Sequence, residues 1–313
     1  MFTKGMQALA RSIAPAGLKA LTAWRTRKFT VSQTTSREGE SMDFASGVDQ
    51  PLDGEVMRLM SEEFGIKRFL TEEGKDFPER NSVGGNRAIQ DIIDGSSNFI
   101  TGEPDWSLSV AVEDDGVVFL GGIFCPARGE FLVAERGQGT YFLNTYGLTL
   151  AQVLNNINRG RLKSITVQEF ALPQKRLDLP PLERVRLYSH TGRLRNYELN
   201  PQDPWNTLPS KLANPGCTFC CTAALVKVAL GKLDGAAIGY QNRWDFAAGG
   251  LLITEAGGHF MVVDRDDPRR VLTPHDLSQA YAGNNASGRE WQCHVFAAGA
   301  KDVHDAVAAH FQP

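Results

Sequence analysis

The chain has 313 residues, of which 42% are hydrophobic and 22% are charged, and its formal net charge is −3. This length can bury a large core, in one domain or in two packed ones, and the composition is typical of a soluble globular protein. The slight negative charge argues against nucleic-acid binding through long-range electrostatics, and no apolar run has the length of a membrane-spanning helix. We therefore expect neither nucleic acid nor a membrane as a partner.

The N-terminal segment is basic, since residues 1–37 contain no aspartate or glutamate. This composition is typical of an organelle transit peptide or of a basic first helix, and we favour the helix. The apolar pattern over residues 7–24 predicts a helix that is interrupted or restarted at Pro15, because proline cannot donate a backbone hydrogen bond inside a helix. A clearer amphipathic helix is predicted over residues 54–64.

Strands dominate the prediction for the rest of the first half. Short strands over residues 69–70 and 88–93 each end at an acidic turn. Further strands are separated by turn signals such as Asp114-Asp115-Gly116, and they cover residues 106–112, 116–124, 130–136 and 139–143. Consecutive strands of this kind predict an antiparallel meander, and the alternation of apolar and polar residues predicts a sheet with one covered face.

The second half of the chain alternates strands with helices. Strands are predicted over residues 185–189, 236–239 and 259–263, helices over residues 223–230, 245–255 and 303–311, and a further strand-like stretch from Val271 to about Ala282. The polar, proline-rich stretch 172–215 predicts mostly loop. Alternation of this kind is typical of an α/β sheet. The expected fold class is therefore α/β, with an α+β part over residues 1–150 and an α/β part over residues 151–313.

The five cysteines are too unevenly spaced for a disulfide framework, which favours a reducing compartment, and we expect a cytoplasmic protein. Cys217, Cys220 and Cys221 include a CxxC spacing. A zinc site would need a second pair or nearby histidines, so packing around a turn is the preferred interpretation.

Acidic residues recur where apolar runs meet turns, at Glu72-Glu73, at Asp91 and Asp94, and at Asp245. Any one of these acids alone would be an ordinary turn residue. Mg²⁺ takes oxygen ligands and uses one or two carboxylates per ion, so several carboxylates from separate segments could hold more than one cation. Metal-assisted phosphoryl chemistry is the natural use of such a site.

The combination of these motifs is far more specific than any one of them. The motifs are Glu72-Glu73, the run Asp91-x-x-Asp94-Gly95-Ser96-Ser97-Asn98-Phe99, and Trp244-Asp245 leading into Thr254-Glu255-Ala256-Gly257-Gly258. Together they closely resemble the inositol monophosphatase family, from about residue 43 to the C-terminus. The resemblance implies a layered α-β-α-β-α sandwich and a Mg²⁺-dependent enzyme that hydrolyses a small polyol or sugar phosphate monoester. It also implies inhibition by Li⁺ and a homodimer.

The resemblance also implies a set of metal ligands. Carried over residue by residue, the ligands are Glu72, Asp91, Asp94, Asp245 and the backbone carbonyl of Ile93. A water bound to the cation would be the nucleophile, because coordination lowers the pKa of that water towards neutrality.

The remaining implied roles are catalytic and phosphate-binding. Glu72, together with Ser96 paired with Asp49, would orient or deprotonate the attacking water. Gly95 permits a tight turn, and Ser96 and Ser97 would then start a short helix whose N–H groups bind the phosphate.

Departures from the family pattern bear on the substrate. Ile92 stands where the family has proline, and Ser96 replaces a threonine while keeping the hydroxyl. Ile238 falls where the animal enzymes have a glutamate that contacts inositol, and an apolar side chain cannot accept hydrogen bonds from a sugar. Two alternatives therefore stay open: fructose-1,6-bisphosphatase activity on the same scaffold, and a non-catalytic regulatory protein.

Overall fold

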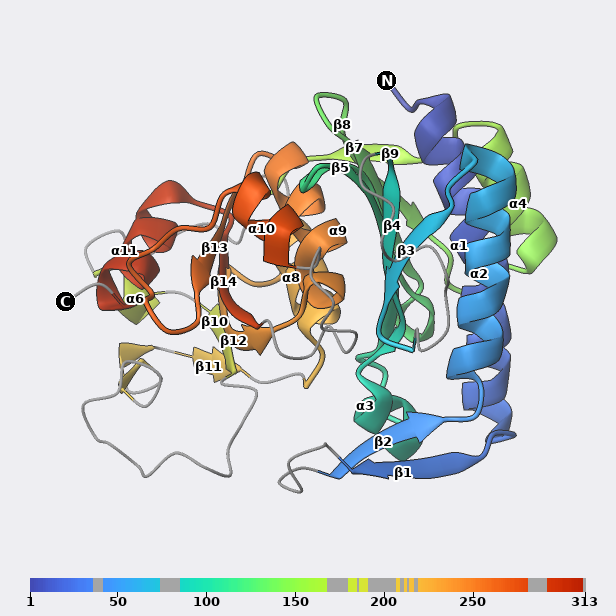
Figure 1. Cartoon of the computed structure of the whole chain (residues 1–313), viewed down its shortest axis with the longest axis horizontal. Coiled ribbons are helices and arrows are strands. Elements are labelled where there is room, and N and C mark those ends of the chain that lie inside the picture. Colours follow the sequence, from blue (N-terminus) through green and yellow to red (C-terminus); the bar gives the residue numbers. More distant parts are fainter. Residues whose placement is uncertain are drawn as a thin grey trace.

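The computed structural model describes residues 1–35, 42–73, 85–167, 180–184, 186–190, 207–208, 211–212, 214–216, 219–280 and 292–311. Figure 1 shows five layers: outer helices, a seven-stranded sheet, a central pair of helices, a five-stranded sheet and a second set of outer helices. The predicted α/β class and the α-β-α-β-α sandwich are confirmed.

The first helix, α1 (Lys4–Thr26), is continuous, so the predicted interruption at Pro15 is wrong. Proline removes one hydrogen bond from the helix interior. The helix persists because one face, which includes Leu9 and Ile13, is fully buried against the first sheet. Packing of an amphipathic face is the main source of helix stability in proteins, and here it outweighs the missing bond.

The second helix, α2 (Asp49–Phe64), begins at Asp49 rather than at residue 54. It packs beside α1, and two of its acids, Glu55 and Glu63, form ion pairs with basic residues of that helix. Lys19 Nζ lies 2.7 Å from Glu55 Oε1, for example. The basic N-terminal residues therefore belong to a helix that is part of the packed fold.

The first sheet has the strand order β3-β4-β5-β6-β7-β8-β9, and all its pairs are antiparallel except β3–β4. Its strands are β3 (Arg68–Thr71), β4 (Arg87–Asp94), β5 (Ser107–Asp114), β6 (Val117–Cys125), β7 (Glu130–Glu135), β8 (Gly139–Asn144) and β9 (Lys163–Ile165). The predicted meander is confirmed. Several smaller elements were not predicted. They are the turn η1 (Pro126–Arg128), the helix α4 (Leu150–Asn158), strand β9 and a small hairpin of β1 (Val31–Thr35) and β2 (Met42–Ser46).

Both faces of this sheet are covered, so the expectation of one covered face is wrong. Every residue of β5 is buried except Asp114 at its end. Helices α1 and α2 cover one face, and α8 (Cys221–Ala229) and α9 (Arg243–Glu255) cover the other (Figure 1). Small residues allow the close contact with α9, since a Cβ at Gly121 would lie 3.2 Å from the Cα atom of Ala248.

The second sheet has the order β11-β10-β12-β14-β13, with parallel pairs at β11–β10 and β10–β12. Its strands are β10 (Arg186–His190), β11 (Asn214–Gly216), β12 (Gly235–Gln241), β13 (His259–Asp264) and β14 (Cys293–Ala298). Helices α6 (Pro181–Arg184) and α11 (Lys301–Phe311) form the outer layer (Figure 1).

Two expectations for this half need correction. The strand-like stretch after Val271 is instead a single bridge between Val263 and Val271, followed by helix α10 (Pro274–Ala280). Its end at residues 281–282 lies outside the described residues. The stretch 172–215, expected to be mostly loop, contains α6, β10 and part of β11 among its described residues, and much of the rest lies outside them.

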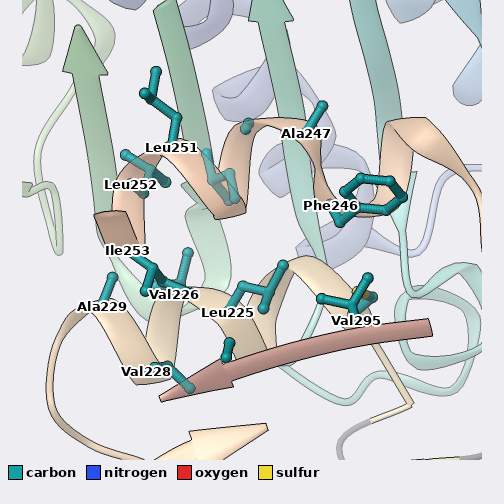
Figure 2. Close-up of a cluster of buried hydrophobic side chains, with 14 of the residues drawn as sticks. Leu225, Val226, Val228, Ala229, Phe246, Ala247, Leu251, Leu252, Ile253 and Val295 are labelled. Carbon is teal, nitrogen blue, oxygen red and sulfur yellow. The ribbon is translucent and has the colours of Figure 1, made fainter. Parts of the chain in front are cut away.

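The central helices α8 and α9 pack tightly between the sheets. Figure 2 shows Leu225 of α8 and Ile253 of α9 in the interface between the two helices, and Leu251 on the side of α9 that faces the first sheet. The approach is closest at Gly249, where a Cβ would lie 2.5 Å from Leu225 Cδ1 and 2.9 Å from Leu225 Cβ.

We expect Gly249→Ala to lower the free energy of unfolding by about 1–3 kcal/mol, because the added methyl group overpacks this interface. The matched control is Gly54→Ala on α2, where a new Cβ meets nothing within 4 Å. That change should stabilise the protein by about 0.4–1 kcal/mol, since alanine loses less conformational entropy on folding. Urea denaturation of both variants measures the difference, and equal stabilities would contradict the close packing of α8 on α9.

Candidate active site

The acids predicted as metal ligands lie near one another at the edge of the first sheet. Asp91 and Asp94 are on β4, and Glu72 directly follows β3, the parallel neighbour of β4. Asp245 is in the first turn of α9, which packs on β4 and β5. The sheet register and one helix therefore bring together carboxylates that are far apart in the sequence.

Burial and mutual repulsion raise the pKa values of two of these carboxylates. Burial raises the pKa of Asp91 well above its usual value, and the charges of Glu72, Asp94 and Asp245 raise it further. Burial likewise raises the pKa of Asp245, with contributions from Asp94 and Glu72. Asp91 is 3% exposed, Asp94 and Asp245 are half-buried, and Glu72 is exposed, so the group extends from the interior to the surface.

The donor chemistry of this group fits a hard divalent cation, since the side chains are carboxylates that repel one another in the absence of positive charge. As the side chains lie, however, no three His, Cys, Asp or Glu side chains among the described residues form a group that could hold a metal ion. The residues therefore fit a hard divalent cation in chemical type, and to hold one their side chains would have to move closer together.

The turn after Asp91 is fixed by short-range bonds. The β4–β5 register shifts between Asp91 and Asp94, which marks a bulge at residues 92–93. Ile93 N–H donates to Asp91 Oδ1 at 3.1 Å, and Ser96 Oγ donates to the Ile93 carbonyl at 2.9 Å. The carbonyl predicted as a metal ligand thus already accepts one bond, and a carbonyl oxygen has two lone pairs in all.

Gly95 has a φ of 85°, which favours glycine, and it precedes the short helix α3 (Ser96–Thr101). A Cβ at Gly95 would lie 2.9 Å from the Asp105 carbonyl oxygen. Ser96 is half-buried and Ser97 is exposed at the first turn of α3, where backbone N–H groups have no partner within the helix. The predicted phosphate-binding residues therefore start a helix next to Asp94.

The predicted pair of Ser96 and Asp49 is not made in this structure. Asp49 instead accepts two bonds from Ser46, from its N–H at 2.8 Å and from its hydroxyl at 2.7 Å. The Ser96 hydroxyl donates to Ile93. Burial raises the pKa of Asp49 to about 7, and the charges of Glu73 and Asp53 add to this effect against the Ser46 hydrogen bonds. The catalytic role of Asp49 remains a prediction.

The raised pKa of Asp49 predicts a pH dependence of stability. The folded protein holds this proton up to about pH 7, while the unfolded chain releases it near pH 4, so stability should fall as the pH rises through this window. The loss for this group is at most about 1.4 kcal/mol per pH unit. In metal-free protein, Asp49→Asn should reduce the fall in urea-denaturation stability between pH 4.5 and 7.5. Exposed Asp115→Asn is the control, and an equal fall in both variants would contradict the assignment.

Two features of the site were not predicted from the sequence. Thr222, the second residue of α8, donates its N–H to Asp94 Oδ2 at 2.6 Å and its hydroxyl to the same oxygen. Arg243, at the start of α9, is 3% exposed and bonded to Glu113 of β5. Neither contact has a local sequence signal, because both depend on how α8 and α9 pack. Ile238 is fully buried in the core, so its side chain does not line the site.

This chain is similar to known proteins over most of its length. The model of the inositol monophosphatase family matches residues 4–304. The inositol-1-monophosphatase of Mesorhizobium japonicum is 30% identical and covers 79% of this chain and 80% of its own length. The Nus factor SuhB of Pasteurella multocida is 25% identical, with coverages of 79% and 81%. The structure of the extragenic suppressor protein suhB from Bartonella henselae has a TM-score of 0.69 at 19% identity and covers 99% of each chain.

Proposed function

Because this chain belongs to the inositol monophosphatase family, we propose that it is a Mg²⁺-dependent phosphomonoesterase acting on a small polyol or sugar phosphate. The observation that supports this proposal is the gathering of Asp91, Asp94, Asp245 and Glu72 beside the start of α3. Mutually repelling carboxylates are costly to bury, and a bound cation removes that cost.

The site residues would have different roles in the reaction. Asp91, Asp94, Asp245, Glu72 and the Ile93 carbonyl would hold Mg²⁺. When bound, Mg²⁺ supplies Lewis-acid stabilisation of the phosphate and lowers the pKa of a coordinated water.

The N–H groups at the start of α3, from Gly95 to Ser97, would bind phosphate oxygens and stabilise the charge that develops during attack. Glu72 is exposed and would accept the proton of the attacking water. The Ser96 hydroxyl and Asp49 would orient that water after Ser96 leaves its bond to Ile93.

A substrate panel tests the proposal. Purified protein is incubated with inositol 1-phosphate, fructose 1,6-bisphosphate and histidinol phosphate, each with Mg²⁺ or with EDTA, and released phosphate is measured. We expect release that requires Mg²⁺. The two esters differ in the alcohol that leaves, which is inositol in one and a sugar phosphate in the other. Preference for fructose 1,6-bisphosphate would therefore support the bisphosphatase alternative.

A regulatory role is the second candidate, and the similarity to a protein named Nus factor SuhB favours it. This alternative predicts that no ester of the panel releases phosphate even at saturating Mg²⁺. Glu72 and the carboxylates of β4 and α9 are all present, which is why we place the enzyme first.

We retain the other expectations as parts of the proposal. They are inhibition by Li⁺, a homodimer, a cytoplasmic location and the absence of nucleic-acid and membrane partners. Among the described residues, no helix combines the length and the apolar character needed to cross a membrane.

A further inference from the structure

Thr222 is buried, with no exposed surface, where α8 begins. Its backbone N–H and its hydroxyl both donate to one oxygen of Asp94, Oδ2, and the N–H bond is 2.6 Å long. Hydrogen bonds to a carboxylate are stronger than those between neutral groups. Two such bonds from one residue fix the rotation of the carboxylate and leave Oδ1 as the oxygen that Thr222 does not hold.

A second hydroxyl fixes Thr222 in turn. Ser107 is fully buried and lies opposite Asp94 in the β4–β5 register, and its Oγ is bonded to the Thr222 hydroxyl. A threonine hydroxyl has one proton, and that proton goes to Asp94, so Ser107 must be the donor in this bond. The result is a hydrogen-bonded chain from Ser107 through Thr222 to Asp94, in which each bond polarises the next.

The main chain of Asp94 is held by the same helix start. Cys220, the residue that caps α8, donates its thiol to the Asp94 carbonyl at 3.4 Å. Asp94 is therefore tied to α8 through its side chain and its main chain. Helix α8 also packs on α9, which carries Asp245. The position of α8 therefore affects the distance between the carboxylates of β4 and the carboxylate of α9.

We propose that Thr222, held by Ser107, is a positioning residue that orients Asp94 towards the divalent cation and thereby sets the affinity of the site for that cation. This inference rests on the proposed function, in which Asp94 is a metal ligand. Residues that orient metal ligands typically change metal affinity about 10–100-fold when they are replaced. A threonine with a purely structural role would lower stability and leave metal affinity unchanged.

The test compares Thr222→Val with Thr222→Ser. Valine keeps the volume and the backbone N–H but removes the hydroxyl, and serine restores the hydroxyl. Binding of Mn²⁺ without substrate is followed by electron paramagnetic resonance of the free ion. We expect Thr222→Val to weaken Mn²⁺ binding about 10–100-fold and Thr222→Ser to bind close to wild type. The Mg²⁺ concentration for half-maximal phosphate release should rise in parallel, with a smaller change in KM for the ester.

The matched control is Thr140→Val. Thr140 is also fully buried, and its hydroxyl donates to the Leu252 carbonyl at 2.7 Å, away from the acids. This control loses a similar buried bond and should bind Mn²⁺ like wild type. Thermal unfolding of each variant shows whether it is folded.

If Thr222→Val does not fold, Ser107→Ala takes its place, and weaker Mn²⁺ binding is again expected. Unchanged Mn²⁺ binding in the folded variants would overturn the inference. Mn²⁺ binding that depends on Thr222, in a protein that hydrolyses no ester of the panel, would support the inference and overturn the proposed function. Wild-type protein that binds no Mn²⁺ would overturn both.

Discussion

An Asp94→Asn variant is expected to release phosphate at least about 100-fold more slowly than wild-type protein at saturating Mg²⁺ and substrate. Asparagine has the same shape but no charge, so the site loses one of the carboxylates that would balance a divalent cation. The Thr222 N–H and hydroxyl can still donate to the amide oxygen, which should preserve the fold around residue 94.

The measurement is initial-rate phosphate release over a range of Mg²⁺ concentrations. Asp114→Asn at the exposed end of β5 is the control, because it makes the same chemical change outside the site. Near-normal turnover in Asp94→Asn would remove Asp94 from the reaction. Loss of activity with unchanged Mn²⁺ binding would place Asp94 in the reaction but not in the metal site.

The composition of the site could be predicted because its acids lie in compact motifs. Glu72 and Asp91 follow apolar runs and Asp245 precedes one, and the structure brings them together through the β3–β4 register and the start of α9. The side-chain partners could not be predicted in the same way. Thr222 meets Asp94 across a sequence separation of 128 residues, and that contact depends on the placement of α8.

The Asp49–Ser96 pair shows that motif position alone does not fix which side chains are bonded to each other. Motif position identified both residues, but the nearest donors and acceptors decide which bonds form. Ser46 lies three residues before Asp49 and satisfies both of its oxygens, and the Ile93 carbonyl lies three residues before Ser96. Local partners of this kind compete directly with distant ones.

The fold was predictable wherever the pattern of apolar and turn residues indicated which residues are buried and where each strand ends. Strands β5 to β8 have clear turns between them, and their order follows the sequence. Coverage of the sheet was not predictable, because burial of β5 on both faces depends on helices from both ends of the chain. Strand β14 (Cys293–Ala298) was missed, since a short apolar run does not distinguish a strand from a helix.

Among the substitutions proposed here, Glu113→Gln is expected to lower the free energy of unfolding most, by about 3–5 kcal/mol. Glu113 is 2% exposed and accepts bonds from two buried arginines: Arg87 Nε at 2.9 Å and Arg243 Nη2 at 2.9 Å. Burial alone would raise the pKa of Glu113, but the charges and hydrogen bonds of Arg243 and Arg87 outweigh it and lower the pKa. Glutamine keeps the shape and removes the charge, so two buried guanidinium groups lose the carboxylate that they share.

The loss of stability in Glu113→Gln arises because the ion pairs of Glu113 are buried, and an exposed ion pair serves as the control. Arg58 and Glu62 form an exposed i,i+4 pair on α2, so Glu62→Gln should change the free energy of unfolding by less than about 0.5 kcal/mol. Urea denaturation at neutral pH measures both variants. Because Arg243 lies two residues before Asp245, Glu113→Gln should also weaken Mn²⁺ binding, as the first turn of α9 loses its anchor on β5. A small effect on stability, equal to that of Glu62→Gln, would show that the buried arginines find other acceptors and that Glu113 does not fix the start of α9.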